Sequence, residues 1–230
     1  MSGTDNGDAG DRKAKAFLQD AYSLESEADT LAFYDRWAEE YDAQLERGLH
    51  YIAPRLLAQT LARHADVGDD PILDVGCGTG LSCCCLRELG YTSVDGIDFS
   101  AAMLKKAEEK GVYRKLIEAD LNSVLPFENA TYGAAISTGT FTLGHVGPEP
   151  IDEVLRVLMP GAYFACTVHD AIWDSRGFSG KFADLERLGA IRSAEQSTGS
   201  FFEGSETSAR YCVFQKPPFS ARALPDGGRH

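Results

Sequence analysis

The chain has 230 residues, of which 43% are hydrophobic and 25% are charged, and its 35 acidic residues against 22 basic ones leave a formal net charge of −13. This is the composition of an ordinary globular protein, which excludes a fibrous repeat and bulk disorder. Because the charge repels a polyanion over most of the surface, we expect no nucleic-acid partner. No apolar run approaches the length of a bilayer span, so we expect no membrane partner either.

The two ends of the chain are expected to lie outside the folded unit. Residues 1–15 are polar and lack the apolar stretch of a secretory signal peptide, so we expect a disordered tail and a cytoplasmic location, with the nucleus as the alternative. A second flexible tail is expected over residues 217–230. The length between them favours one domain over residues 16–216.

Residues 16–65 show a helical pattern and form a predicted helical cap. Phe33, Tyr34, Trp37 and Tyr41 recur at three- and four-residue steps and therefore share one helix face. No strand pattern occurs before residue 70. The aromatic face fits a lid that closes over a ligand, and it fits a stripe packed on the core as well.

Short apolar runs alternate with helical patterns from residue 70 to 216. Strands are predicted over residues 71–75, 93–97, 116–119, 132–137, 162–168, 190–197 and 208–215. Helices are predicted over residues 81–89, 149–158 and 178–188, together with one that Ser100 caps and Gly111 ends. The alternation indicates a mostly parallel sheet with right-handed crossovers. The segment with Gly199 and Gly204 is too short for a crossover helix, so the last two strands should form an antiparallel hairpin at a sheet edge.

The first predicted strand runs into the glycine-rich sequence GCGTG at residues 76–80. Ligands of a doubly wound sheet bind outside the carboxyl ends of the strands, where this turn lies. Gly76, Gly78 and Gly80 let backbone amides approach a ligand, and at least one of them should adopt a positive φ. Three glycines alone also suit a packing turn, so further residues are needed.

Three aspartates supply that further information. Asp98 ends the second strand, where a carboxylate can accept hydrogen bonds from both ribose hydroxyls. Asp120 follows the third strand and can accept from an adenine amino group, although a solvated strand end is the alternative. Asp74 precedes the first glycine, where a carboxylate disfavours a pyrophosphate and attracts an ammonium or sulfonium group. The glycine spacing also departs from the dehydrogenase fingerprint, so S-adenosylmethionine is favoured over NAD.

Four segments resemble the class I S-adenosylmethionine-dependent methyltransferases. The sequence ILDVGCGTG (72–80) resembles motif I, GIDFSAAML (96–104) the segment after the second strand, LRVLMPGA (155–162) the turn before the fifth strand, and YDRWAEEYD (34–42) the N-terminal segment that closes over the cofactor. Within this class, the chain resembles the Williams–Beuren-syndrome-region methyltransferase-like group. The resemblance implies an α/β, Rossmann-like fold: a seven-stranded mostly parallel sheet with an antiparallel C-terminal hairpin and an N-terminal helical segment.

The resemblance also implies a set of cofactor-binding residues. These are Asp74, Gly76, Cys77, Gly78, Thr79, Gly80, Asp98, Phe99, Met103, Asp120, Leu121, Ser137, Thr138, Tyr34, Trp37 and Tyr41. Ser137, Thr138 and Gly139 should border the methionine portion and the methyl acceptor. The Asn-Pro-Pro-Tyr tetrad and the fourth-strand aspartate of metal-dependent members are absent, and Gly133 replaces an aspartate common near that strand. These departures remove clues to the acceptor.

The predicted function is methyl transfer from S-adenosylmethionine to a small-molecule acceptor by in-line displacement. A protein methyltransferase and a non-catalytic cofactor-binding module remain as alternatives, with an NAD-dependent oxidoreductase behind them. Alignment alone can supply most of the catalysis, so no catalytic residue is assigned. His145 and His169 are positioned to serve as a base, and ordinary surface or packing histidines are the alternative. No metal site is expected, since the adjacent side chains of Cys83, Cys84 and Cys85 point about 100° apart on a helix.

Overall fold

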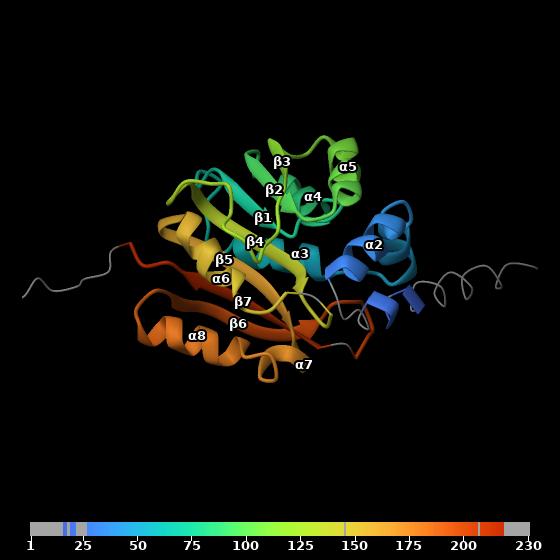
Figure 1. The fold of residues 1–230 in the computed structure, drawn as a ribbon. Helices are drawn as coiled ribbons and strands as arrows, with labels where there is room; N and C mark the ends of the chain where they lie inside the picture. The colour runs from blue at the N-terminus through green and yellow to red at the C-terminus, as the bar shows by residue number, and fades with distance from the viewer. Residues whose placement is uncertain (1–15, 18, 22–26, 145, 207, 219–230) are drawn as a thin grey trace, which may run out of the picture.

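The computed structural model describes residues 16–17, 19–21, 27–144, 146–206 and 208–218. The tail expected over residues 1–15, most of the one expected over 217–230, and His145 lie outside the described residues. A seven-stranded mixed sheet carries helices on both faces (Figure 1). The predicted α/β fold, with its antiparallel C-terminal hairpin, is confirmed.

The strand order places a crevice at the middle of the sheet. The strands are β1 (Ile72–Val75), β2 (Val94–Asp98), β3 (Lys115–Glu118), β4 (Tyr132–Phe141), β5 (Leu158–His169), β6 (Arg192–Ser200) and β7 (Ser208–Gln215). Their order across the sheet is β3-β2-β1-β4-β5-β7-β6. Strands β1 to β5 pair in parallel, whereas β7 is antiparallel to both β5 and β6. Because the order reverses between β1 and β4, the carboxyl ends of these two strands border the crevice in which such sheets bind ligands.

The helices follow their local sequence signals. They are α2 (Glu27–Trp37), the π-helix η1 (Ala43–Gly48), α3 (Ala53–Leu61), α4 (Leu81–Glu88), α5 (Ala101–Lys110), α6 (Pro150–Val157), α7 (Asp170–Trp173) and α8 (Phe178–Arg187). The Ser100 hydroxyl accepts from the Met103 amide at 3.1 Å, and Gly111 ends α5 with a φ of 62°. Both ends of α5 are thus as predicted. No helix of the described residues is long and apolar enough to cross a bilayer.

Apolar side chains pack on both faces of the sheet. Leu73 and Val75 join the cluster that contains residues of α6, α7 and α8, whereas Ile72 joins the opposite cluster with residues of α3 and α4. Since side chains alternate along a strand, Asp74 projects to the same face as Ile72. It is consequently buried, with 1% of its surface exposed.

Four elements differ most from the prediction. Strand β5 begins at Leu158, four residues before the predicted start at 162, and includes the last residue of the helix predicted over 149–158. Strand β4 continues to Phe141 rather than ending at Ser137, because its pairing with β5 shifts register between these residues and resumes afterwards. Strand β6 extends to Ser200, so Gly199 pairs with Ala209 inside the hairpin instead of lying in the turn. Helix α7 was not predicted, since its four residues are too few to show a helical period.

Gly133 occupies a position that excludes a side chain. A Cβ atom built there would lie 2.3 Å from the carbonyl oxygen of Asp69 and 2.6 Å from its carbonyl carbon. The Gly133 amide also donates to the Pro71 carbonyl at 3.0 Å. The glycine that replaces the common aspartate is therefore explained by a close backbone approach.

Gly133→Ala should destabilise the protein by about 1–3 kcal/mol, because the backbone of Asp69 must move to admit the methyl group. Urea unfolding followed by circular dichroism measures the change. Gly180→Ala in α8 is the control, since a Cβ there meets nothing within 4 Å and alanine favours a helix by about 0.5–1 kcal/mol over glycine. Equal effects of the two substitutions would contradict the packing argument.

Candidate functional site

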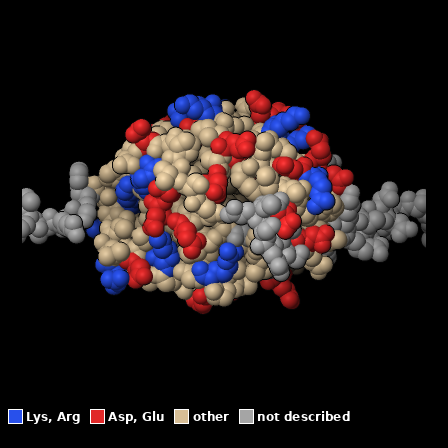
Figure 2. All heavy atoms as spheres, viewed as in Figure 1, with Lys and Arg blue, Asp and Glu red and all other residues tan. Residues whose placement is uncertain are grey.

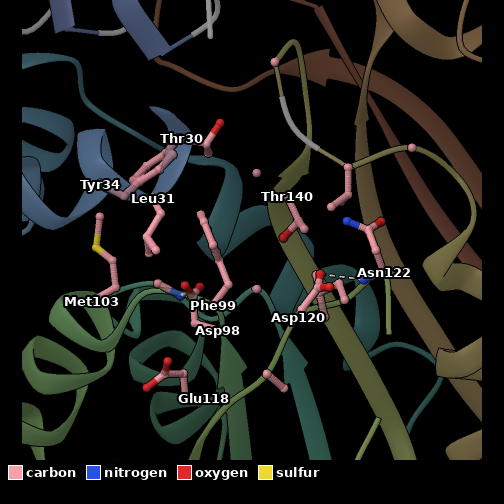
Figure 3. Close-up of a pocket in the computed structure, with 18 of the residues that line it drawn as sticks. Thr30, Leu31, Tyr34, Asp98, Phe99, Met103, Glu118, Asp120, Asn122 and Thr140 are labelled. Carbon is pink, nitrogen blue, oxygen red and sulfur yellow. Dashed lines mark hydrogen bonds between the residues drawn. The ribbon is translucent and has the colours of Figure 1, made fainter. Parts of the chain in front are cut away.

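A cavity of about 930 Å³ lies at the carboxyl ends of β1, β2 and β4. The close-up in Figure 3 shows side chains of α2 facing those at the strand ends across it. The volume is near the top of the usual range for ligand sites, about 300–1,000 Å³, so a nucleoside leaves room for a second molecule. The predicted site residues that line the cavity are Tyr34, Tyr41, Gly76, Gly78, Asp98, Phe99, Met103, Asp120, Leu121 and Thr138.

Six predicted site residues are buried beside the cavity and do not line it. They are Trp37, Asp74, Cys77, Thr79, Gly80 and Ser137. The Ser137 hydroxyl donates to the Val75 carbonyl at 2.9 Å, and the Trp37 indole donates to the Gln44 side chain at 2.8 Å. The aromatic face of the cap therefore divides: Tyr34 and Tyr41 reach the cavity, whereas Trp37 packs in the core.

The glycine loop presents its backbone to the cavity. Gly76, Gly78 and Gly80 have φ values of 65°, 52° and 91°, which confirms the expected positive φ. A Cβ atom on Gly76 would lie 2.4 Å from the Thr140 hydroxyl oxygen, so a side chain there would collide with β4. Residue 76 must therefore be glycine for both its conformation and its neighbours.

Asp98 bridges the glycine loop and the start of α5. Its Oδ2 accepts from the Gly78 amide at 2.8 Å, and its Oδ1 accepts from the Ser100 amide at 3.0 Å. The side chain is 6% exposed, and burial raises the pKa of its carboxyl group above the usual range, with the backbone amides opposing that rise. These two amides hold the carboxylate at the tip of β2, where it lines the cavity.

Asp74 lies beneath the loop and has one oxygen without a partner. Its Oδ2 accepts from the Tyr113 hydroxyl at 2.7 Å, while its Oδ1 has no hydrogen-bond partner among the described residues. Burial raises the pKa of Asp74 to about 7; the Tyr113 hydrogen bond opposes the rise and Asp98 adds to it. An unpaired, buried carboxyl oxygen beside positive-φ glycines fits a cofactor with a cationic end.

Tyr113 is a site residue that the sequence reasoning missed. A Cβ atom on Gly80 would lie 2.8 Å from its ring, and one on Gly96 would lie 2.9 Å from it. The ring therefore occupies space that these two glycines leave open. The signal that could have indicated such a close approach is Gly96, a glycine within a buried strand.

The segment after β3 lines the wall of the cavity on that side of the sheet. Asp120 Oδ1 accepts from the Asn122 amide at 2.8 Å, which Figure 3 marks, and its Oδ2 accepts from the Ser123 hydroxyl at 3.0 Å. Glu118 and Asn122 also line this wall, and sequence reasoning missed both. Asp120 is thus held by its own turn, and its side chain is exposed to solvent.

The irregular end of β4 forms a further wall. Thr138, Gly139 and Thr140 line the cavity where β4 shifts register, and the Gly139 amide is held by the Thr167 hydroxyl at 2.9 Å. Several more lining residues come from loops or from α2, where no pattern in the sequence distinguished them. They are Thr30, Leu31, Ala119, Gly144, Val146, Gly147, Glu149 and Arg176.

Three acidic side chains fasten the cap to the cofactor side of the sheet. Asp35 accepts from the Ser100 hydroxyl at 2.7 Å, and Glu39 pairs with Lys106 at 2.8 Å. Asp42 accepts from the Thr79 hydroxyl and pairs with Lys110 at 2.6 Å. Lys110 also donates to the Thr79 carbonyl at 2.7 Å, so one lysine joins the cap to the glycine loop. We call Asp35, Glu39 and Asp42 the cap latch.

His169 is engaged away from the cavity. Its Nδ1 accepts from the Ala171 amide at 3.1 Å at the start of α7, and its ring stacks on Phe201 at 5.8 Å between centroids. Burial lowers its pKa, which Asp170 partly opposes. The structure thus places His169 outside the cavity lining, and His145 is outside the described residues. No three His, Cys, Asp or Glu side chains of the described chain are grouped as a metal ion requires.

Comparison with known proteins agrees with this fold. Residues 73–166 match the family model described as a methyltransferase domain. The human Methyltransferase-like protein 27 is 35% identical over 162 residues, which cover 67% of this chain and 64% of that protein. The bovine 18S rRNA (guanine-N(7))-methyltransferase is 42% identical over 66 residues, 29% of this chain and 23% of that protein. The chain thus spans less than two thirds of either relative.

Among solved structures, the methyltransferase of a complex with the Haloferax volcanii Trm112 methyltransferase activator shares the fold. Its TM-score is 0.64 at 17% identity, over 81% of this chain and 97% of that one. The fold is therefore that of the class I S-adenosylmethionine-dependent methyltransferases, and the methyltransferase-domain match supports S-adenosylmethionine as the cofactor. Within that class, the chain is related to Methyltransferase-like protein 27, which confirms the resemblance read from the sequence.

Asp42→Ala should loosen the cap by removing its contacts with Thr79 and Lys110. We expect amide hydrogen exchange over residues 27–48 to become about two- to fivefold faster, since a partly exposed ion pair contributes up to about 1 kcal/mol. Mass spectrometry of peptic fragments measures this. Asp152→Ala is the control, because it removes a pair of the same length, with Lys181, outside the cap. Unchanged hydrogen exchange over the cap in the Asp42→Ala variant would refute the claim that Asp42 helps to hold the cap in place.

Proposed function

We propose that this protein transfers a methyl group from S-adenosylmethionine to a small-molecule acceptor that binds in the same cavity. The observation that carries the proposal is the continuity of the cavity. One space joins the glycine loop and Asp98 to the walls formed by Thr138–Thr140 and by Glu149 and Arg176. A cofactor held at the strand ends of β1 and β2 therefore leaves its reactive end facing an accessible volume.

The residues of this chain suit the parts of that cofactor. The Gly76 and Gly78 backbone would approach its methionine portion, Asp98 would accept from the ribose hydroxyls, and Asp120 with Leu121 would face the adenine. S-adenosylmethionine, when bound, supplies a methyl group already activated by a sulfonium. Asp74 would stabilise the cationic end from below the loop. The Tyr34 and Tyr41 rings would exclude water and offer their faces to the sulfonium.

Alignment is the main task left to the protein. Holding two reactants in line supplies a large share of the barrier reduction in such displacements, about 7–11 kcal/mol at best. The rigid end of β4, held by Thr167 and Val75, suits that task. His169 is an unsuitable base, since it does not line the cavity and its Nδ1 accepts from the Ala171 amide, which leaves the proton of the neutral ring on Nε2. We therefore assign positioning roles and no catalytic base.

The acceptor class is argued from charge and space. Asp98, Glu118, Asp120 and Glu149 line the cavity together with one basic residue, Arg176. Such a lining disfavours a phosphate-rich acceptor. On the face shown in Figure 2, the basic and acidic side chains are interspersed, without the basic stripe that tracks a nucleic-acid backbone. The match to an rRNA methyltransferase covers 23% of that relative and carries little weight for an RNA acceptor.

Other functions remain testable. A protein acceptor uses the same cavity, and transfer of a labelled methyl group to metabolite or protein fractions separates the two. Cofactor binding without transfer to any fraction would indicate a binding module. The neighbour in complex with the Trm112 activator makes a protein partner a second candidate, which co-purification with tagged protein tests. The cytoplasmic or nuclear location stays a prediction.

Asp98→Asn should weaken S-adenosylhomocysteine binding about ten- to a hundredfold, because a hydrogen bond to a charged group contributes about 1.5–3 kcal/mol. Isothermal titration calorimetry measures the affinity, and NAD in the same experiment tests the oxidoreductase alternative. Asp184→Asn on α8 is the control, since that carboxylate is 66% exposed and its ion pair is with the neighbouring Arg187. Unchanged affinity in a folded Asp98→Asn variant would contradict the ribose-binding role proposed for Asp98, on which the proposed site depends.

A further inference from the structure

Tyr113 and Asp74 form a buried pair beneath the glycine loop. Tyr113 follows α5 and precedes β3, and its ring lies against Gly80 and Gly96. Gly96 is the register partner of Asp74 across β1 and β2. A ring lying over Gly96 is thus beside the Asp74 side chain, and its hydroxyl donates to Asp74 Oδ2 at 2.7 Å.

The surroundings of Asp74 leave its carboxylate without a compensating charge. Its register partner on the other side is the apolar Ile136 of β4, and its Oδ1 has no partner among the described residues. The titratable groups acting on the pair are the Asp98 carboxylate and the thiols of Cys77 and Cys83. All are acidic groups. Charge repulsion from Asp35 also raises the pKa of Asp98.

A buried carboxylate in such surroundings favours its neutral form. Because Tyr113 donates its proton toward Oδ2, the acid proton of neutral Asp74 belongs on Oδ1. Oδ1 is therefore both the atom that carries the proton and the carboxyl oxygen without a hydrogen-bond partner among the described residues. A cation placed above the glycine loop would act on it through a poorly polarisable medium.

We propose that Tyr113 is a positioning residue that fixes Asp74 so that Oδ1 releases its proton to solvent when the cationic cofactor binds. The inference rests on the proposed function, and it adds a coupling between protonation and cofactor affinity. The O–H bond of the neutral carboxyl group breaks, its electron pair stays on Oδ1, and the proton leaves with buffer. No other reactant is needed.

The direction of the pH dependence follows from the two states. In the free protein, the pKa of Asp74 is raised to about 7. A nearby cation lowers it, so the deprotonated protein binds the cofactor more tightly. Affinity should therefore rise with pH by up to about tenfold per pH unit and level off above about pH 7. Tyr113 favours the ionised form, so removing its hydroxyl raises the Asp74 pKa further and moves the plateau to higher pH.

The test is calorimetry with S-adenosylhomocysteine, whose amino group is cationic at neutral pH, from about pH 5.5 to about pH 8.5 in buffers of different ionisation enthalpy. The wild type should release up to one proton per ligand near pH 6. Tyr113→Phe keeps the ring and should bind about tenfold more weakly at pH 7, with affinity recovering at higher pH. Asp74→Asn should release no proton and lose the pH dependence.

Tyr132→Phe is the matched control, because it removes a tyrosine hydroxyl that donates to another buried carboxylate, Asp95, at 3.0 Å. Its pH profile should equal that of the wild type. A loss of affinity in Tyr113→Phe that is the same at every pH would show a purely structural role and overturn the inference. Tight binding without proton release by the wild type would overturn it too, and would leave the proposed function standing. A folded wild type that binds neither S-adenosylhomocysteine nor S-adenosylmethionine would overturn both this inference and the proposed function.

Discussion

The contact between Gly76 and Thr140 is the constraint on which the site depends. The Thr140 hydroxyl lies in the space that a side chain at position 76 needs, and it donates to the Val75 carbonyl at 3.1 Å. The glycine loop after β1 and the irregular end of β4 are therefore seated against each other at the point where the strand order reverses. These two chain segments, 65 residues apart, therefore line one cavity together.

Local signals were sufficient for most of the fold. Ser100 and Gly111 bound α5 as predicted because capping is a property of a few consecutive residues. The hairpin of β6 and β7 followed from the short connection between them. The extension of β4 past Ser137 could not be predicted, because its register shift is set by pairing with β5 and by the distant Thr167 side chain.

The residues of the candidate site were likewise predictable only in part. Residues at the ends of predicted strands, such as Asp98 and Asp120, reach the cavity because topology brings those ends together. Tyr113, Glu149 and Arg176 come from connecting segments, whose side-chain directions depend on packing between distant elements. Trp37 shows the opposite case: its helix face was recognised, but only the neighbours of that helix determine which aromatic ring is buried.

The cap contributes to the site in two separate ways. Tyr34 and Tyr41 line the cavity, whereas Asp35, Glu39 and Asp42 bind Ser100, Lys106, Lys110 and Thr79, which are parts of the protein itself. Ligand contact and cap attachment are thus carried by different side chains of one segment. A substitution in one set leaves the contacts made by the other set in place.

That separation has an evolutionary consequence. Substitutions of Asp35, Glu39 or Asp42 change how firmly the cap is attached, while Tyr34 and Tyr41 keep their place in the cavity lining. Related chains can accordingly differ in the strength of cap attachment, through carboxylates outside the cavity lining, without a change in the two tyrosines that line it.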